Sequence, residues 1–140
     1  ANTILYYPSE NGTGLISSNI TFDRYNNEKT EQKLMSALLR GLDKTGGYLP
    51  LPVNTKLYSI KVADETAYPD FSEDFQLYMS EEEDSLKVRL TIYSIVNTLT
   101  ELPYIKQVKF LIEGYPAGIY ADMDLNLPLK RDITYLNIQN

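Results

Sequence analysis

The sequence contains no cysteine, no histidine and no tryptophan. Without cysteine the chain can form no disulfide and offers no thiolate as a nucleophile or metal ligand. Without histidine it lacks the imidazole on which most acid–base catalysis and most zinc sites depend. We therefore expect no catalytic residue, no metal site and no cofactor.

Positive charge is also scarce. The chain carries 13 lysine and arginine residues against 19 aspartate and glutamate residues, which gives a net charge of -6 and a sequence pI of about 4.6. Such a chain is not attracted over long range to phosphates or to anionic lipid. We expect no nucleic-acid partner.

Long apolar runs of the kind that span a membrane are absent as well. The sequence starts at Ala1, directly before an apolar segment, and we interpret this start as the mark of a removed targeting segment. Membrane contact would then be made only through an anchor preceding Ala1. The length of 140 residues and the hydrophobic fraction of 43% predict one domain over residues 1–140.

Tyrosine is abundant, with 12 residues against 4 phenylalanines. Tyrosine suits half-buried strand faces, because its ring packs while its hydroxyl reaches water, and it also suits recognition of sugars and peptides. The candidate ligand-binding residues, as stacking platforms for a sugar or peptide, are Tyr6, Tyr7, Tyr68 and Tyr115.

The first part of the chain predicts a β-hairpin and a helix. Residues 3–7 and 15–23 have strand character and are separated by the turn-forming sequence PSENGTG. Over residues 28–42 the period changes to that of a helix, since leucines recur every fourth residue. Asn27 is placed to cap this helix.

The middle of the chain predicts a strand over residues 56–62, with Tyr58, Ile60 and Val62 facing inward. A second extended segment runs to Phe71. It contains Pro69, which has no amide hydrogen, so we expect this residue at a sheet edge or a bulge.

A second, central helix is expected over residues 81–101, with Ser80 and Glu83 in capping-box spacing. After it, a strand should point Val108, Phe110 and Ile112 inward, and residues 133–138 could add one short strand. The predicted fold class is α+β: two helices packed on one face of a small, mostly antiparallel sheet.

Two chemical motifs were weighed and set aside. Asp122, Asp124 and Asn126 imitate the opening of a calcium-binding loop, but Leu127 and Ile133 stand where that loop needs glycine and glutamate, so a solvated turn is favoured. A carboxylate pair for glycoside hydrolysis is available in composition, yet no spacing singles one out. A hydrolase is therefore the least favoured interpretation.

The order of several segments resembles a known family. They are TILYYPSENGTGL, LMSALLRG, LPLPVNTKLYSIKV, AYPDFS, IYSIVNTLTELPYIKQVKFLIEGYP and DMDLNLPLKRD. Together they resemble the GerM-type (GerMN) domain of bacterial sporulation and spore germination proteins. The resemblance implies a membrane-anchored, often lipoprotein, chain of Gram-positive bacteria, lying outside the cytoplasmic membrane and without known enzymatic activity. It also implies a likeness to ring-building modules, in which copies or partners join edge to edge.

The expected function is that of an extracytoplasmic protein-interaction module that is not an enzyme. Its expected partners are proteins of the cell envelope or the sporulation apparatus, and self-association is also expected. The alternative is a module that binds cell-wall glycan or peptide.

Overall fold

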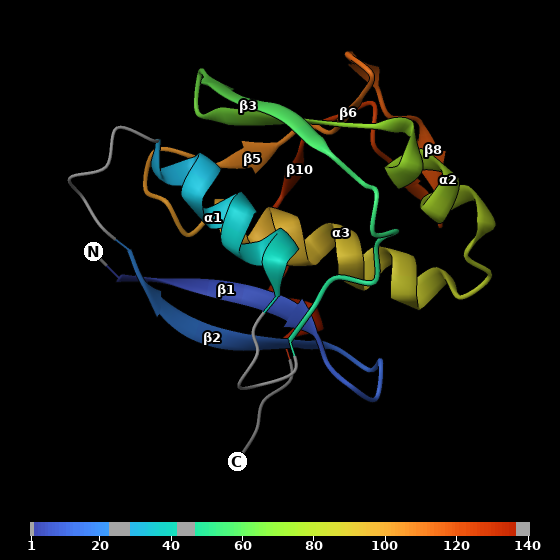
Figure 1. The fold of residues 1–140 in the computed structure, drawn as a ribbon, viewed down its shortest axis with the longest axis horizontal. Helices are drawn as coiled ribbons and strands as arrows, with labels where there is room; N and C mark the ends of the chain where they lie inside the picture. Colours follow the sequence, from blue (N-terminus) through green and yellow to red (C-terminus); the bar gives the residue numbers. More distant parts are fainter. Residues whose placement is uncertain (1, 23–28, 42–46, 137–140) are drawn as a thin grey trace.

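The computed structural model of the chain describes residues 2–22, 29–41 and 47–136, and it has the predicted α+β class (Figure 1). The predicted hairpin is confirmed. Strands β1 (Asn2–Pro8) and β2 (Leu15–Thr21) pair antiparallel, with Asn2 opposite Thr21 at one end and Pro8 opposite Leu15 at the other.

Helix α1 (Thr30–Arg40) lies inside the predicted range of 28–42. Its buried stripe contains Leu34, Met35 and Leu38, as the leucine spacing predicted. The helix ends at Gly41, whose φ of +83° a residue with a side chain rarely adopts. The expected cap, Asn27, lies outside the described residues.

The expected single helix over residues 81–101 is two helices, α2 (Glu73–Glu81) and α3 (Ser85–Leu99). The predicted capping box is wrong, because Ser80 lies within α2. The cap of α3 is Asp84, whose carboxylate accepts hydrogen bonds from the amides of Leu86 and Lys87 at 3.0 and 3.3 Å. Because Asp84 satisfies the first free amides of α3, a new helix starts here and the expected single helix is divided into α2 and α3.

A six-stranded sheet forms the other half of the fold. Strands β3 (Leu57–Ala63) and β4 (Thr66–Phe71) make an antiparallel hairpin. On its other side β4 pairs in parallel with β5 (Gln107–Val108) and β6 (Leu111–Ile112). Strands β7 (Tyr115–Pro116) and β10 (Leu129–Lys130) complete the sheet. Counted over all three sheets of the described residues, five of the seven strand pairings are antiparallel, as expected.

The predicted edge position of Pro69 is wrong, because β4 is the central strand. The carbonyl group of Ala67 accepts a hydrogen bond from the amide of Lys109, and that of Phe71 accepts one from the amide of Glu113. Ala67 and Phe71 therefore direct their backbone groups toward β5 and β6. Because this direction alternates along a strand, the backbone of Pro69 points the same way. The pairing with β5 ends at Ala67 and that with β6 begins at Asp70. The missing amide hydrogen therefore falls in the interruption between β5 and β6.

The expectation that Tyr58 faces inward is also wrong. The register of β3 against β4 shifts between Leu57 and Ser59, which leaves Tyr58 in a β-bulge. Its side chain is exposed, whereas Ile60 is buried and Val62 half-buried, as expected.

Helices α1 and α3 lie between the β1–β2 hairpin and the six-stranded sheet (Figure 1). Val108, Phe110 and Ile112 point into this core, which confirms their predicted orientation. Phe71, Phe75 and Phe110 form an aromatic cluster with ring centroids 4.4 to 6.4 Å apart. Because α3 packs against both the β1–β2 hairpin and the six-stranded sheet, it is the central element of the fold.

The C-terminal part contains the small hairpin β8 (Ile119–Tyr120) and β9 (Met123–Asp124), followed by the 3₁₀ helix η1 (Ile133–Tyr135). The strand predicted from Ile133 is therefore wrong at its start, and its last two residues, 137–138, lie outside the described part. Asp132 favours the helical turn, since its carboxylate accepts hydrogen bonds from the amide and the hydroxyl of Thr134. Within the described ranges no helix is both long and apolar enough to cross a membrane.

Candidate functional site

The four tyrosines proposed as ligand-binding residues do not form one surface. Tyr6 and Tyr7 are buried in β1, because that strand is covered on both faces. Tyr68 is half-buried in β4, and Tyr115 is exposed in β7. Of these residues, only Tyr115 offers a largely free ring. The interpretation of Tyr6 and Tyr7 as stacking platforms is thus corrected.

Tyr6 instead takes part in a polar network that joins the two ends of the chain. Its hydroxyl accepts a hydrogen bond of 2.7 Å from Arg131, and its amide donates one of 2.9 Å to the buried hydroxyl of Thr98. Arg131 also donates to the carbonyl of Asn97 and to the carboxylate of Glu101. These contacts hold β1 and the C-terminal segment against α3.

Three of the tyrosine hydroxyl groups are poor acid–base catalysts at neutral pH. Burial raises the pKa of Tyr7 and of Tyr78 to about 12. Burial and the hydrogen bond that Tyr104 donates to Glu31 at 2.9 Å raise the pKa of Tyr104 to about 12. All three hydroxyls stay protonated near neutrality and act as hydrogen-bonding groups.

The residues that imitate a calcium loop are used to close the turn around β8 and β9. The carboxylate of Asp124 accepts the amide hydrogen of Asn126, and the side-chain oxygen of Asn126 accepts that of Gly118. In the part of the chain that the structure describes, no three acidic side chains come together in a way that could hold a metal ion.

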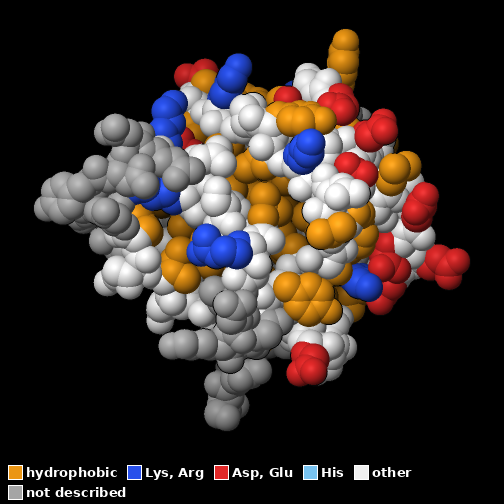
Figure 2. All heavy atoms as spheres, viewed as in Figure 1, with side chains coloured by type: hydrophobic (Ala, Val, Ile, Leu, Met, Phe, Trp, Pro, Cys, Tyr) orange, Lys and Arg blue, Asp and Glu red, His pale blue; other side chains and the backbone are white. Residues whose placement is uncertain are grey.

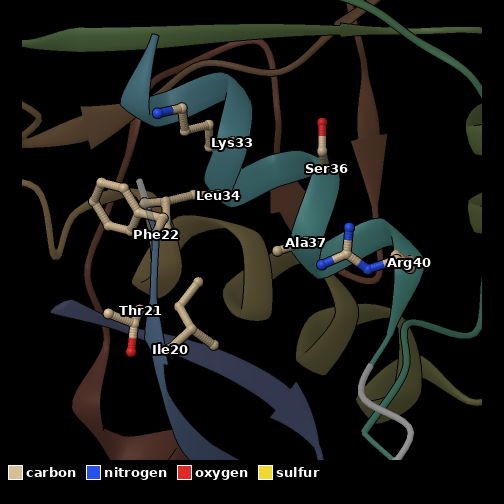
Figure 3. Close-up of a pocket in the computed structure, with 8 residues that line it drawn as sticks. All are labelled: Ile20, Thr21, Phe22, Lys33, Leu34, Ser36, Ala37 and Arg40. Carbon is tan, nitrogen blue, oxygen red and sulfur yellow. The ribbon is translucent and has the colours of Figure 1, made fainter. Parts of the chain in front are cut away.

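A groove of about 330 Å³ lies between the end of β2 and α1 (Figure 3). Its apolar lining consists of Ile20, Phe22, Leu34 and Ala37. Lys33 and Arg40, two helical turns apart on α1, supply positive charge. The nitrogen of Lys33 lies 5.8 Å from the centroid of the Phe22 ring. The described residues that line the groove include no acidic side chain.

Strand β3 has a free edge in the described structure, because β4 is its only strand partner. Alternate residues of β4 direct their backbone groups toward β3, and their partners in β3 are Ser59, Lys61 and Ala63. These three residues use their own backbone groups to pair with β4. The backbone amides and carbonyls of Ile60 and Val62, which alternate with them, consequently point away from the sheet. A row of unpaired backbone groups is a template for an added strand.

A second surface, of which the sequence analysis singled out only Tyr115, lies where the chain passes from β7 through β8 and β9. We call it the β7–β9 surface. Its exposed apolar side chains are Tyr115, Ile119 and Leu127, with exposed fractions of 73%, 65% and 59%. Its exposed carboxylates are Glu113, Asp122 and Asp124. Figure 2 shows hydrophobic and acidic side chains interspersed on the side of the molecule where Figure 1 places α2.

The comparisons with known proteins concern nearly the whole chain. Residues 4–118 match the family model Germane, described as sporulation and spore germination. No curated protein matches the chain. The family description names a biological process and no reaction.

Solved structures show the same fold at low sequence identity. The tandem GerMN domains of the sporulation protein GerM from Bacillus subtilis match with a TM-score of 0.72 and 22% identity over 94% of this chain. The chain spans 45% of that tandem structure. The first GerMN domain of the same protein matches with a TM-score of 0.64 and 20% identity, over 94% of this chain and 96% of that one.

A third structure is a Clostridium perfringens protein assigned as a lipoprotein. It matches with a TM-score of 0.62 and 23% identity, over 100% of this chain and 94% of that one. At these identities the structural matches establish the fold.

Proposed function

This chain belongs to the Germane family of sporulation and spore germination, and from that premise we propose that it is a protein-interaction module without enzymatic activity. The observation that carries the proposal is the free edge of β3, where the backbone of Ile60 and Val62 is available to a partner strand. Strand addition of this kind gives affinity through main-chain hydrogen bonds.

The partner strand belongs to another protein rather than to a second copy. Two β3 strands that paired antiparallel around Lys61 would place that lysine directly opposite itself, and like charges in this position are destabilising. Lysine on an edge strand and a bulge such as that at Tyr58 are both features that discourage pairing between identical edges. A partner strand with an acidic residue opposite Lys61 would instead be compatible with this edge.

The proposed location is outside the cytoplasmic membrane, in a protein held at the envelope by an anchor beyond the described segment. Support comes from the fold shared with a protein assigned as a lipoprotein and with a sporulation protein. The proposed partners are proteins of the cell envelope or of the sporulation apparatus.

The substitution Val62→Pro tests the edge. It removes an amide hydrogen that points away from β4, so the β3–β4 hairpin keeps its own hydrogen bonds while an added strand loses one. Val62→Ala is the matched control, because it shortens the same side chain and retains the amide. The wild-type domain and both variants would be immobilised and exposed to solubilised envelope proteins of the source organism. Hydrogen exchange would then be measured in the captured complex.

We expect wild type and Val62→Ala to retain the same partner, Val62→Pro to lose it, and the amides of Ile60 and Val62 to become protected in the complex. Equal capture by all three proteins, or protection confined to another surface, would contradict the edge assignment. Saturable retention on purified peptidoglycan without protein capture would favour the glycan-binding alternative.

A further inference from the structure

We propose that the β7–β9 surface binds an amphipathic segment of a partner protein that presents lysine or arginine beside apolar side chains. The proposal rests on the proposed contact function but uses a surface separate from the outward backbone of Ile60 and Val62. It starts from exposure: Tyr115, Ile119 and Leu127 lie close along the chain and each leaves more than half of its side chain in water. A contiguous exposed apolar patch marks an interaction site, and the proposal requires these three side chains to form one.

Hydrogen bonds fix the backbone of this surface. The amide of Gly114, in the turn before Tyr115, donates to the carboxylate of Asp70 at 2.9 Å. The amide of Gly118 donates to Asn126 at 3.0 Å, and the carbonyl of Gly118 accepts the amide of Leu125 at 2.7 Å. The last two bonds bring the neighbours of Ile119 and Leu127 together.

The surface is also tied to the rest of the domain. The side-chain amide of Gln76, in α2, donates to the hydroxyl of Tyr120 at 2.9 Å. The hydroxyl of Tyr58, in β3, donates to the carboxylate of Glu113 at 3.1 Å. A surface held in place before binding loses little conformational entropy when a partner docks.

The charge on this surface selects the partner. Ile119 and Asp124 are directly opposite each other in the β8–β9 pairing, so an apolar side chain and a carboxylate stand side by side. Glu113 lies two residues before Tyr115. In the described structure, the ion pairs are those of Lys87 with Glu82 and of Arg131 with Glu101, and neither involves these carboxylates. The complementary partner supplies cations around an apolar centre.

Other ligand classes fit less well. An anionic lipid surface would be repelled by Glu113, Asp122 and Asp124. A neutral glycan could stack on Tyr115, but it would not use Ile119 or Leu127 to the same extent, because sugar recognition relies on aromatic rings and polar groups. The mixture of aliphatic and acidic groups therefore favours a basic amphipathic peptide segment.

The test uses a synthetic amphipathic peptide of leucine and lysine with the leucines at helical spacing, and a control peptide in which every lysine is replaced by glutamate. Each is titrated into the isotope-labelled domain, and amide chemical shifts are followed by NMR. We expect shifts to concentrate between Glu113 and Leu127 with the lysine peptide, to weaken as salt is added, and to be absent with the glutamate peptide.

Variants sharpen the result. The double substitution of Tyr115→Ser and Ile119→Ser should weaken binding by about tenfold, because exposed apolar anchors dominate the affinity of such contacts. Val53→Ser is the control: Val53 is 98% exposed but lies in the loop before β3, so binding should not change. Thermal unfolding of each variant checks that the fold is intact.

Several outcomes would overturn the inference: no shifts with the lysine peptide, shifts centred on another surface, equal binding of the glutamate peptide, or equal loss in Val53→Ser. Retention on peptidoglycan that falls in the double variant would reassign the surface to glycan. Val62→Pro separates the two proposals, since it should abolish strand addition at β3 and leave binding of the lysine peptide unchanged.

Discussion

Arg131 donates a hydrogen bond of 2.7 Å to the hydroxyl of Tyr6, and its guanidinium carbon lies 5.1 Å from the centroid of the same ring. The guanidinium thus both bonds to the tyrosine and packs against its face. The contact joins the first strand to the segment after the last one. It therefore links the beginning of the described fold to its end.

Loss of this link should destabilise the whole domain. We expect Arg131→Met to lower the free energy of unfolding by about 1–3 kcal/mol, because hydrogen bonds to a charged donor are lost and the hydroxyl of Tyr6 loses its donor. Urea denaturation followed by circular dichroism measures the change. Arg40→Met, on the exposed end of α1, is the control and should change stability by less than about 0.5 kcal/mol. Equal effects of the two substitutions would show that Arg131 does not have this role.

The position of the helix cap gives a second prediction. Asp84→Ala should cost about 1 kcal/mol of stability, since the amides of Leu86 and Lys87 lose their acceptor. Ser80→Ala should be nearly neutral, because Ser80 is exposed within α2. Thermal unfolding of both variants checks the order. A larger loss for Ser80→Ala would support one continuous helix in place of α2 and α3.

The stability of the domain should fall at high pH. Burial raises the pKa of Tyr7 to about 12 from an ordinary value near 10, so the folded state disfavours the tyrosinate. The stabilisation is complete below pH 10. Between pH 10 and pH 12 the unfolded chain loses the proton while the folded chain keeps it. In that window Tyr7 alone should lower the free energy of unfolding by up to about 1.4 kcal/mol per pH unit.

The melting temperature measured from pH 8 to pH 12 reveals this slope, and absorbance at 295 nm follows tyrosine ionisation. Tyr7→Phe should flatten the decline above pH 10. It should also cost about 0.5–1.5 kcal/mol at neutral pH, because the hydrogen bond from Tyr7 to the carbonyl of Ala37 is lost. An unchanged slope in this variant would contradict the assignment of the late-ionising hydroxyl to Tyr7.

Replacing Pro69 should change the stability of the domain only slightly. A proline in a central strand would be expected to destabilise it, but we predict no gain when this proline is removed. Restoring an amide hydrogen with Pro69→Val should not stabilise the sheet, because that amide would point into the interruption between β5 and β6. The unfolded chain also gains freedom when proline is removed, so a loss of up to about 1 kcal/mol is expected. Chemical denaturation measures it. A gain in stability would mean that a ladder hydrogen bond forms at this position.

Local patterns predicted the elements whose signal lies within a few residues. The alternation in β2 and the leucine spacing of α1 both reflect one buried face, and the sequence predicted both elements correctly. Helix α2 was missed because only Phe75 and Met79 are fully buried along it, which is too weak a pattern to distinguish from a loop. Its position depends on contacts of Phe75 with Phe71 and Phe110.

Features that depend on distant segments were not accessible from the sequence pattern. The parallel pairing of β4 with β5 and β6 joins segments about 40 residues apart and leaves no local trace. Tyr6 and Tyr7 were both interpreted as stacking platforms for a ligand. Both are buried, because the C-terminal segment covers the second face of the hairpin. The β7–β9 surface is likewise visible only once the exposures of Tyr115 and Ile119 are known.

The central place of β4 sets the order in which a newly made chain can fold. Its hairpin partner β3 precedes it directly, but β5 and β6 follow only after α2 and α3, and Arg131 comes later still. An emerging polypeptide can pair β1 with β2 early, but it cannot close the six-stranded sheet until β10 has been synthesised. Contacts at such separation slow folding. The six-stranded sheet should consequently be the last part of the fold to form.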